Sequence, residues 1–543
     1  MATASLGDGL FSGSCTGAGS VPSGKDTVLQ VGCLGHLNMR PLVGSHLYDG
    51  ADVAWAPQWP RFCLGLVVVG SHAGRSIRRH GLRGPWACAM MEIRGVGPRS
   101  LPCEQNRFWP GSKAEVENKK GNLLTELVLT SPRARGLFVL TAHPEGCRVR
   151  VEEQLKRAGA AFEKPLAAAA GRTALVLGST TFGYGSSTAI ALRKAGFDRI
   201  IGVGYETPPS FRGEKLAMSS PGWYLTHALH EHDSAYETYL ADAFSAATRD
   251  RLMADLQERG IEIDLVVYSV AAPRRSHLGQ EWNSSLLVQG DPLEVVGLDF
   301  KSGQLGPIRV EAASEMQVEE TRRVMGGDDL EMWVNALLYS GRAAEGMKVA
   351  SLSYIGPELP PLRRMYWDGA LGEAKKHIDA TTAELNTRLS SAVGGRAFTV
   401  MNPAVVTSAS VAIPAMLRYI SDFLGAADAG YGVYEDPLDV GIHFVKSLYG
   451  DGEPWQGELD EEGRLRLDQK ELEAGLQSEI EKLWQLQESG DPDPVTQAGF
   501  ARFKREYSML YGWEVEGVDY EAAYPVDPAM GPAQRVIDLL ESD

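Results

Sequence analysis

The architecture of this chain follows from the stretch TALVLGSTTFGYGSSTAIALRKAGFDRIIGVG, residues 173–204. It begins with a short apolar run, passes through a glycine-rich loop at 178–185, continues with a segment of helical character and ends in a second apolar run. A strand, a glycine-rich turn, a helix and a second strand are the parts of a dinucleotide-binding unit. Its glycines allow backbone N–H groups to approach a pyrophosphate at the positive end of the helix. The loop residues expected to bind the cofactor are Gly178, Ser179, Thr180, Thr181, Gly183 and Tyr184.

An acidic residue follows the second apolar run, where Tyr205 and Glu206 stand at its end. A carboxylate at this position can accept hydrogen bonds from both hydroxyls of an adenosine ribose, and it repels a 2′-phosphate. The pattern therefore predicts NADH in preference to NADPH. The alternative is that Glu206 is a capping residue before the Pro208-Pro209 turn.

Apolar runs of strand length alternate with helical patterns through the rest of the body. Small residues at 270–272 follow one of these runs and suit a flat ring lying against the backbone. This alternation predicts an α/β fold, a doubly wound and mostly parallel Rossmann-like sheet with a helical C-terminal extension. The expected strands are 137–142, 173–178, 199–204, 263–269, 347–354 and 398–403, with hairpins within 274–315 and 450–464. The expected helices are 149–162, 187–196, 234–259, 329–341, 370–385, 437–449, 467–487 and 498–512.

The stretch SLSYIGPELPPLRRMYWDGALGEAKK, residues 351–376, carries the candidate chemistry. Asp368 is a good N-cap for a helix, which puts Tyr366 on the turn before the helix and Lys375 in its second or third turn. The turn can bring the phenol back toward the ammonium, and a neighbouring cation lowers the pKa of a tyrosine. The alternative is a core tyrosine and a solvated helix lysine.

This Tyr-x8-Lys arrangement, with YIGPE before it and GEAKK within the following helix, resembles the trans-2-enoyl thioester reductases of the FabV/TER family. The resemblance extends over residues 131–526 and rests on several further runs in the same order. These runs are RGLFVLTAHPEGC at 135–147, GWY at 222–224, DAF at 242–244, DLVVYSVAAP at 264–273, VMGGDDLEMW at 324–333, VVTSASVAIP at 405–414 and EGVDY at 516–520.

The resemblance implies an enzyme of fatty acid synthesis that uses NADH to reduce the C2–C3 double bond of trans-2-enoyl-CoA or enoyl-acyl-carrier-protein. Tyr366 would donate to the enolate oxygen and supply the proton, while Lys375 would bind ribose or phosphate oxygens of the cofactor. Tyr354 would contact the thioester. The other cofactor contacts that it implies are Asp242, Ala243, Val270, Ala271, Val405, Val406 and Thr407.

Three departures from the family pattern favour a second reading, a catalytically impaired homologue that serves as a structural or binding subunit. The glycine-rich loop holds one extra residue, Phe182, which either clashes with the pyrophosphate or bulges outward. Tyr354 and Tyr366 are twelve residues apart instead of ten. Pro403 and Ser408 stand where the family has Lys and Gln. A third reading, a keto-acyl reductase, would fit a Tyr-x3-Lys pair better than the longer spacing found here.

Other catalytic or metal sites are not indicated. His143 and Cys147 lack a second His/Cys cluster, so no metal site is predicted, and Cys147 is expected to be a small buried residue. No Gly-x-Ser-x-Gly or Gly-x4-Gly-Lys-Ser/Thr motif occurs.

Charge and cysteine content divide the chain in two. Residues 1–113 hold 11 Lys and Arg against 6 Asp and Glu, and five of the six cysteines, whereas the whole chain has a net charge of −17. The acidic body argues against nucleic acid as a partner. Residues 1–130 are expected to be an organelle transit leader for the mitochondrion, with the plastid or the cytoplasm as open alternatives, or else partly a gene-model artefact. The reductase domain is expected at 131–530, with a tail at 531–543, as a monomer or homodimer with no membrane span.

Overall fold

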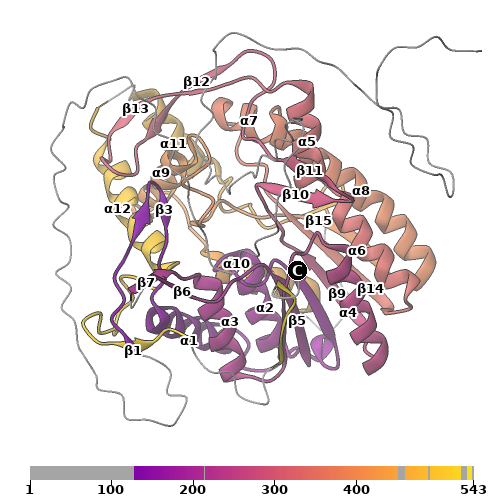
Figure 1. The fold of residues 1–543 in the computed structure, drawn as a ribbon. Helices are drawn as coiled ribbons and strands as arrows, with labels where there is room; N and C mark the ends of the chain where they lie inside the picture. Colours follow the sequence, from indigo (N-terminus) through magenta and orange to yellow (C-terminus); the bar gives the residue numbers. More distant parts are fainter. Residues whose placement is uncertain (1–126, 213–214, 451–458, 487–489, 528–534, 541–543) are drawn as a thin grey trace, which may run out of the picture. The chain divides into compact units, whose positions relative to one another are not determined.

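A computed structural model describes residues 127–212, 215–450, 459–486, 490–527 and 535–540 (Figure 1). The first 126 residues of the expected leader lie outside this part of the chain, and so do residues 451–458 of the hairpin expected at 450–464. Among the described helices, none combines the length and the apolar character that a membrane crossing requires.

The described fold is built on an eight-stranded sheet in the order β16-β15-β14-β9-β4-β5-β8-β18. Every neighbouring pair in it is parallel. From β4 the chain runs outward through β5 and β8 on one side, then returns to β9, β14 and β15 on the other. The predicted doubly wound parallel sheet is confirmed. Its strands are β4 (Thr173–Leu177), β5 (Arg199–Gly204), β8 (Tyr236–Leu240), β9 (Ile263–Tyr268), β14 (Ala343–Ser353), β15 (Arg396–Met401), β16 (Arg464–Arg466) and β18 (Arg535–Asp538).

Helices cover both faces of this sheet, and alternate residues of β4 enter two separate cores. Ala174 and Val176 belong to the first core, while Leu175 and Leu177 belong to the second. A strand buried on both faces has apolar residues at successive positions, so β4 could be predicted from its continuous apolar run. The first core receives α1 (Pro144–Ala161), α2 (Tyr184–Ala195), α3 (Pro221–His232) and α10 (Pro437–Tyr449). The second core receives α4 (Ala246–Arg259), α6 (Asp328–Tyr339) and α8 (Ala370–Val393).

Helices α9 (Met416–Asp428) and α12 (Pro494–Met509) pack against each other beside the first core (Figure 1). A Cβ atom on Gly499 would come within 1.8 Å of the Ser421 carbonyl oxygen, so only glycine allows the two helices this approach. The other described elements are α5 (Glu315–Met325), α7 (Pro360–Tyr366), α11 (Ala474–Leu486), η1 (Ala167–Ala169), β1 (Leu127–Val128), β2 (Ala134–Arg135), β3 (Phe138–Val139), β6 (Ser210–Arg212), β7 (Lys215–Met218), β10 (Arg274–His277), β11 (Gln280–Asn283), β12 (Leu293–Leu298), β13 (Leu305–Val310) and β17 (Tyr524–Pro525).

Several expected elements are wrong in extent or type. The helix predicted over 234–259 is in fact strand β8 followed by α4, because the aromatic and β-branched residues of YETYL fill a position buried on both faces of the sheet. The strand predicted at 137–142 is reduced to β3, which pairs with β2 outside the main sheet. The helix predicted at 467–487 begins only at Ala474. Strand β18, in the expected tail, pairs with β8.

Candidate active site

The predicted site residues gather at the carboxyl ends of the parallel strands, the edge at which open α/β sheets bind their ligands. The glycine-rich loop follows β4, and Glu206 follows β5. Tyr354 follows β14. The order of strands changes direction between β4 and β9, so this edge also holds the topological switch point.

The glycine-rich loop makes a tight turn that leaves space at the start of α2. Gly178 has φ +86°, and a Cβ atom there would lie 2.4 Å from the Ser269 carbonyl oxygen. Gly183, the N-cap of α2, is different, because its Cβ position has no atom nearer than 3.9 Å. Free N–H groups at a helix N-terminus with open space beside them suit a phosphate group. The loop therefore fits a dinucleotide pyrophosphate.

Glu206 is buried among the loop and the start of α3. Its carboxylate accepts a hydrogen bond from Thr180 Oγ1 at 2.9 Å and another from the Ser220 hydroxyl. Burial raises its pKa to about 7, although these two hydrogen bonds act in the opposite direction. Each carboxylate oxygen keeps a second lone pair for a ribose hydroxyl. Tyr205, in contrast, is 67% exposed.

A hydrogen bond from the second core and one within the loop hold the loop after β8 in place. The Ala243 carbonyl oxygen accepts a hydrogen bond from Trp333 Nε1 at 3.0 Å, and the Asp242 carboxylate accepts one from the Phe244 N–H at 2.8 Å. After β9, Val270 is partly buried and Ala271 is exposed. The four residues predicted here to contact the cofactor thus lie on the turns after β8 and β9, at one edge of the sheet.

Tyr366 and Lys375 approach the same end of β14. The Tyr366 ring packs edge-on against the Tyr354 ring, with 4.9 Å between centroids and 87° between planes. Lys375 Nζ lies 3.4 Å from Ser353 Oγ. Ser353 is the last residue of β14 and Tyr354 follows it, so the two predicted catalytic side chains contact this strand end through different residues. Their roles as catalytic groups remain predictions.

The local structure around Tyr366 differs from the expectation. The PPLRRM segment forms helix α7 instead of a turn, because Pro360 occupies its first position, where a missing N–H is harmless. Tyr366 is the last residue of that helix. The N-cap of α8 is Gly369, not Asp368, whose side chain is 53% exposed.

The expectation that Lys375 lowers the pKa of Tyr366 is wrong. Burial raises the pKa of Tyr366 well above its usual value, and the negative charge of Glu471 adds to this. Burial lowers the pKa of Lys375 to about 8, against the opposing effect of Asp379. Tyr366 therefore keeps its proton at neutral pH, and Lys375 is cationic up to about pH 8.

Glu471 is the functional residue that sequence reasoning missed. It is fully buried, and its carboxylate accepts hydrogen bonds from Tyr354 at 3.0 Å, Tyr419 at 2.7 Å and the Ala404 N–H at 2.8 Å. Burial raises its pKa to about 7. It thereby fixes the phenol that packs against Tyr366. No local signal marked it, because it lies in a segment that reads as an amphipathic helix.

The segment after β15 closes the site on its other side. Tyr184, at the first position of α2, donates its hydroxyl to the Pro403 carbonyl oxygen. Val406 is buried, and its N–H donates to Tyr434 Oη at 3.1 Å. The Thr407 N–H donates to Ser410 Oγ at 2.8 Å. The backbone at Pro403 thus joins this segment to the glycine-rich loop.

His143 and Cys147 have structural roles. His143 is the N-cap of α1 and accepts a hydrogen bond from the Gly146 N–H at 3.0 Å. Cys147 is fully buried, as expected, and burial raises the pKa of its thiol. Within the described residues, no group of three or more His, Cys, Asp or Glu side chains could hold a metal ion.

Three family models match successive parts of the chain. Residues 129–211 match the NAD(P)H binding domain of trans-2-enoyl-CoA reductase, and residues 217–439 match its catalytic region. Residues 459–523 match a region described as the enoyl reductase FAD binding domain.

Characterised relatives match over nearly their whole length. The enoyl-[acyl-carrier-protein] reductase [NADH] of Coxiella burnetii is 34% identical over 412 residues, covering 74% of this chain and 97% of the relative. The corresponding protein of Pseudomonas paraeruginosa is 36% identical over 412 residues, with 74% and 98% covered. The trans-2-enoyl-CoA reductase of Treponema denticola, solved with NAD, has a TM-score of 0.66 at 29% identity and covers 74% of this chain and 100% of that one.

Proposed function

This chain belongs to the trans-2-enoyl-CoA reductase family, and from that premise we propose that it reduces the C2–C3 double bond of trans-2-enoyl thioesters with NADH, as a step of fatty acid synthesis. The observation that carries the proposal is that Tyr366 and Lys375 each contact a residue at the end of β14, at the same sheet edge as a glycine-rich loop that fits a dinucleotide.

Tyr366 is suited to stabilise the charge that develops during reduction. When bound, NADH supplies the hydride that adds to C3 of the thioester, and negative charge then appears on the thioester oxygen. A preorganised donor aimed at this oxygen usually makes the largest contribution to such a rate. Tyr366 is protonated, buried and fixed against Tyr354, so it can donate a hydrogen bond to the oxygen as the charge develops. Its proton then passes to C2, which completes the saturated thioester, and the phenolate regains a proton from solvent.

In the proposed mechanism, Lys375 binds the cofactor. Its ammonium is directed toward the strand end, where ribose or phosphate oxygens would lie next to Ser353. The structure gives no support for its acting on the pKa of Tyr366, so its contribution is binding and orientation. Its cationic form is required, because only the ammonium donates all of its hydrogens to oxygen acceptors.

The cofactor-binding residues fit NADH. Glu206 presents a buried carboxylate near the glycine-rich loop, and a 2′-phosphate there would place two negative charges together. One family model describes residues 459–523 as an FAD binding domain. In the described residues of 459–523 no glycine-rich loop joins a strand to a helix, so we assign no step to FAD.

No observation favours the catalytically impaired reading. Phe182 is buried in the wall of a cavity, and Pro403 still takes part in the site through its carbonyl oxygen. Both members of the Tyr/Lys pair are present.

We further propose that residues 1–130 direct the protein to the mitochondrion and that it acts as a monomer or homodimer. The basic leader supports the first part, since residues 71–90 contain four arginines and no acidic residue. Fluorescent fusions with and without the leader test the destination, and analytical ultracentrifugation tests the assembly.

The reaction is tested by following NADH oxidation at 340 nm with the full chain and crotonyl-CoA, and by identifying the product by mass. We expect butyryl-CoA in one-to-one ratio with NADH consumed. A folded protein that binds NADH but reduces no enoyl thioester would contradict the proposed function.

A further inference from the structure

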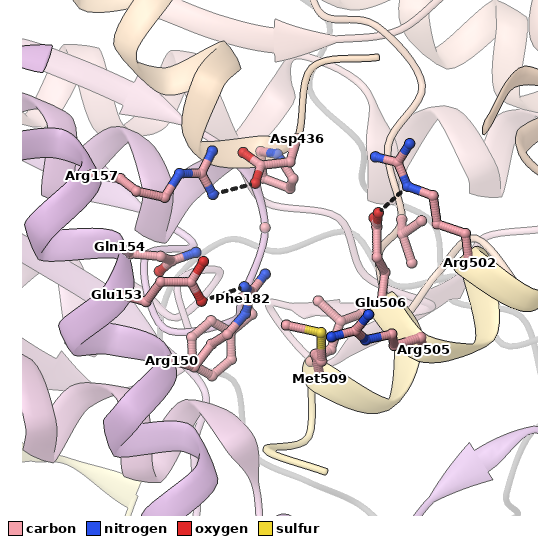
Figure 2. Close-up of a pocket in the computed structure, with 14 residues that line it drawn as sticks. Arg150, Glu153, Gln154, Arg157, Phe182, Asp436, Arg502, Arg505, Glu506 and Met509 are labelled. Carbon is pink, nitrogen blue, oxygen red and sulfur yellow. Dashed lines mark hydrogen bonds and ion pairs between the residues drawn. The ribbon is translucent and has the colours of Figure 1, made fainter. Parts of the chain in front are cut away.

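A cavity of about 300 Å³ lies beside the glycine-rich loop, between α1 and α12 (Figure 2). Its size is at the lower end of the range for small-molecule sites. Figure 2 shows side chains of α1 on one wall and side chains of α12 on the opposite wall, with Phe182 on the α1 side in this view. Gly183 and Val406, two of the expected cofactor contacts, form part of the wall, and the other lining residues take no part in the functions assigned above.

One arginine in the cavity wall has no carboxylate partner among the described residues. Arg150, Arg157 and Arg502 each pair with a carboxylate at 2.6–2.9 Å, those of Glu153, Asp436 and Asp428. Arg505 is the fourth arginine, and in the described part of the chain no carboxylate lies within ion-pair distance of it. An unpaired guanidinium at the rim of a cavity suits a phosphate group, which it can bind with two parallel hydrogen bonds.

A buried acceptor in the wall also lacks a partner. Gln154 is 4% exposed, and its Oε1 has no hydrogen-bond donor among the described residues. Leaving a buried polar atom unpaired costs free energy, so such an atom in a cavity wall points to a ligand with an N–H group. The rest of the wall consists of Gly183, of Glu506, which pairs with Arg502 at 2.8 Å, and of the apolar residues Phe182, Val406, Pro437, Met509 and Leu510.

The cavity adjoins the glycine-rich loop and the segment that closes the active site. Gly183 lines the cavity, and the hydroxyl of the next residue, Tyr184, donates to the Pro403 carbonyl oxygen. Val406 also lines the cavity and directly follows Val405 in the same segment. An arm held in the cavity would therefore lie next to the expected cofactor contacts.

We propose that this cavity binds the 4′-phosphopantetheine arm, which coenzyme A and acyl carrier protein share. Arg505 binds the phosphate, Gln154 Oε1 accepts from an amide N–H of the arm, and the apolar wall contacts its methyl and methylene groups. The extra loop residue Phe182 forms part of that wall. This inference deepens the proposed function and rests on it for the identity of the substrate.

The kinetic test compares Arg505→Glu with Lys504→Glu in the full chain. Lys504 is the exposed neighbour on α12 outside the cavity, so both variants change the net charge equally. For Arg505→Glu we expect the KM for crotonyl-CoA to rise about tenfold or more, from loss of a charged hydrogen bond. The KM for the crotonyl thioester of N-acetylcysteamine, which has no phosphate, and the Kd for NADH should stay unchanged. Equal effects of both variants, equal effects on both thioesters, or a weaker NADH affinity would overturn the proposal.

A binding test separates this inference from the proposed function. Calorimetry with 4′-phosphopantetheine should show binding to the wild-type protein, a loss of binding in Arg505→Glu and a weaker affinity in Gln154→Leu, which removes the unpaired acceptor. Displacement by coenzyme A, by holo acyl carrier protein or by both supports the site and identifies the carrier. If phosphopantetheine does not bind while wild-type turnover is normal, the inference fails and the proposed function stands. If it binds at Arg505 without any turnover, only the proposed function fails.

Discussion

Replacing Glu471 with Gln tests whether a buried carboxylate organises the active site. The wild-type side chain is fully buried and receives three hydrogen bonds, from Tyr354, Tyr419 and the Ala404 N–H. Glutamine has the same shape and can still accept from the two phenols at Oε1, but its NH2 group cannot accept from the Ala404 N–H. The loss of that hydrogen bond does not depend on pH, so the change of the stability difference with pH reports the free energy of burying the charge.

The size of the effect follows from the pKa of Glu471, which burial raises from 4.5 to about 7. An acid with a raised pKa destabilises the folded state progressively as pH rises from its unfolded pKa, about 4.5, to its folded pKa, about 7, and fully above that. Between pH 5 and pH 8 this amounts to about 2.5 kcal/mol, at about 1.4 kcal/mol for each pKa unit. Over this interval Glu471→Gln should therefore gain stability relative to wild type by about 2.5 kcal/mol.

Urea unfolding of both proteins at pH 5 and pH 8 measures this difference, because contributions from all other titrating groups cancel. Glu473→Gln, which changes an exposed acid two residues away, is the matched control and should follow wild type at both pH values. A stability difference between Glu471→Gln and wild type that does not change with pH would refute the reasoning.

Three further predictions concern the cofactor and the tyrosine pair. Glu206→Gln should raise the ratio of kcat/KM with NADPH to kcat/KM with NADH about tenfold or more, because it removes the charge that repels a 2′-phosphate. An unchanged ratio in steady-state assays would show that Glu206 does not select the cofactor. Wild-type kcat/KM should fall as pH rises through about 8, where Lys375 loses its proton, and a Lys375→Arg variant that retains activity should lose this fall in the same pH profile. Tyr354→Phe removes the 3.0 Å hydrogen bond to Glu471 and should lower kcat several-fold with little effect on the Kd for NADH, whereas an equal loss in both would indicate general damage to the fold.

Sequence patterns predicted the parts of this fold in which neighbouring residues carry the information. The strand, loop, helix and strand of 173–204 were predicted correctly because apolar runs and glycines mark them locally. The sequence did not indicate strand β8, because its polar residues Glu237 and Thr238 interrupt the apolar run that is typical of a strand lying between two others. Its partner β18 is nearly three hundred residues away in the chain, and no local pattern specifies such a pairing.

The candidate site divides in the same way. Tyr366 and Lys375 could be singled out because they lie nine residues apart in one recognisable stretch. Glu471 could not, since its contacts with Tyr354 and Tyr419 span 117 and 52 residues. The pKa of Tyr366 was predicted in the wrong direction for the same reason. Burial and the charge of a distant residue control it, and the sequence reveals neither.

The most direct test of the account is the turnover of Tyr366→Phe with crotonyl-CoA and NADH, beside Tyr236→Phe. Tyr236 is a buried tyrosine whose hydroxyl has no hydrogen-bond partner among the described residues, so its substitution controls for loss of a buried phenol. We predict that Tyr366→Phe lowers kcat about a hundredfold or more while the Kd for NADH and the unfolding midpoint remain those of wild type, and that Tyr236→Phe retains activity. A Tyr366→Phe protein with near wild-type kcat would contradict the assignment of the proton donor and with it the mechanism.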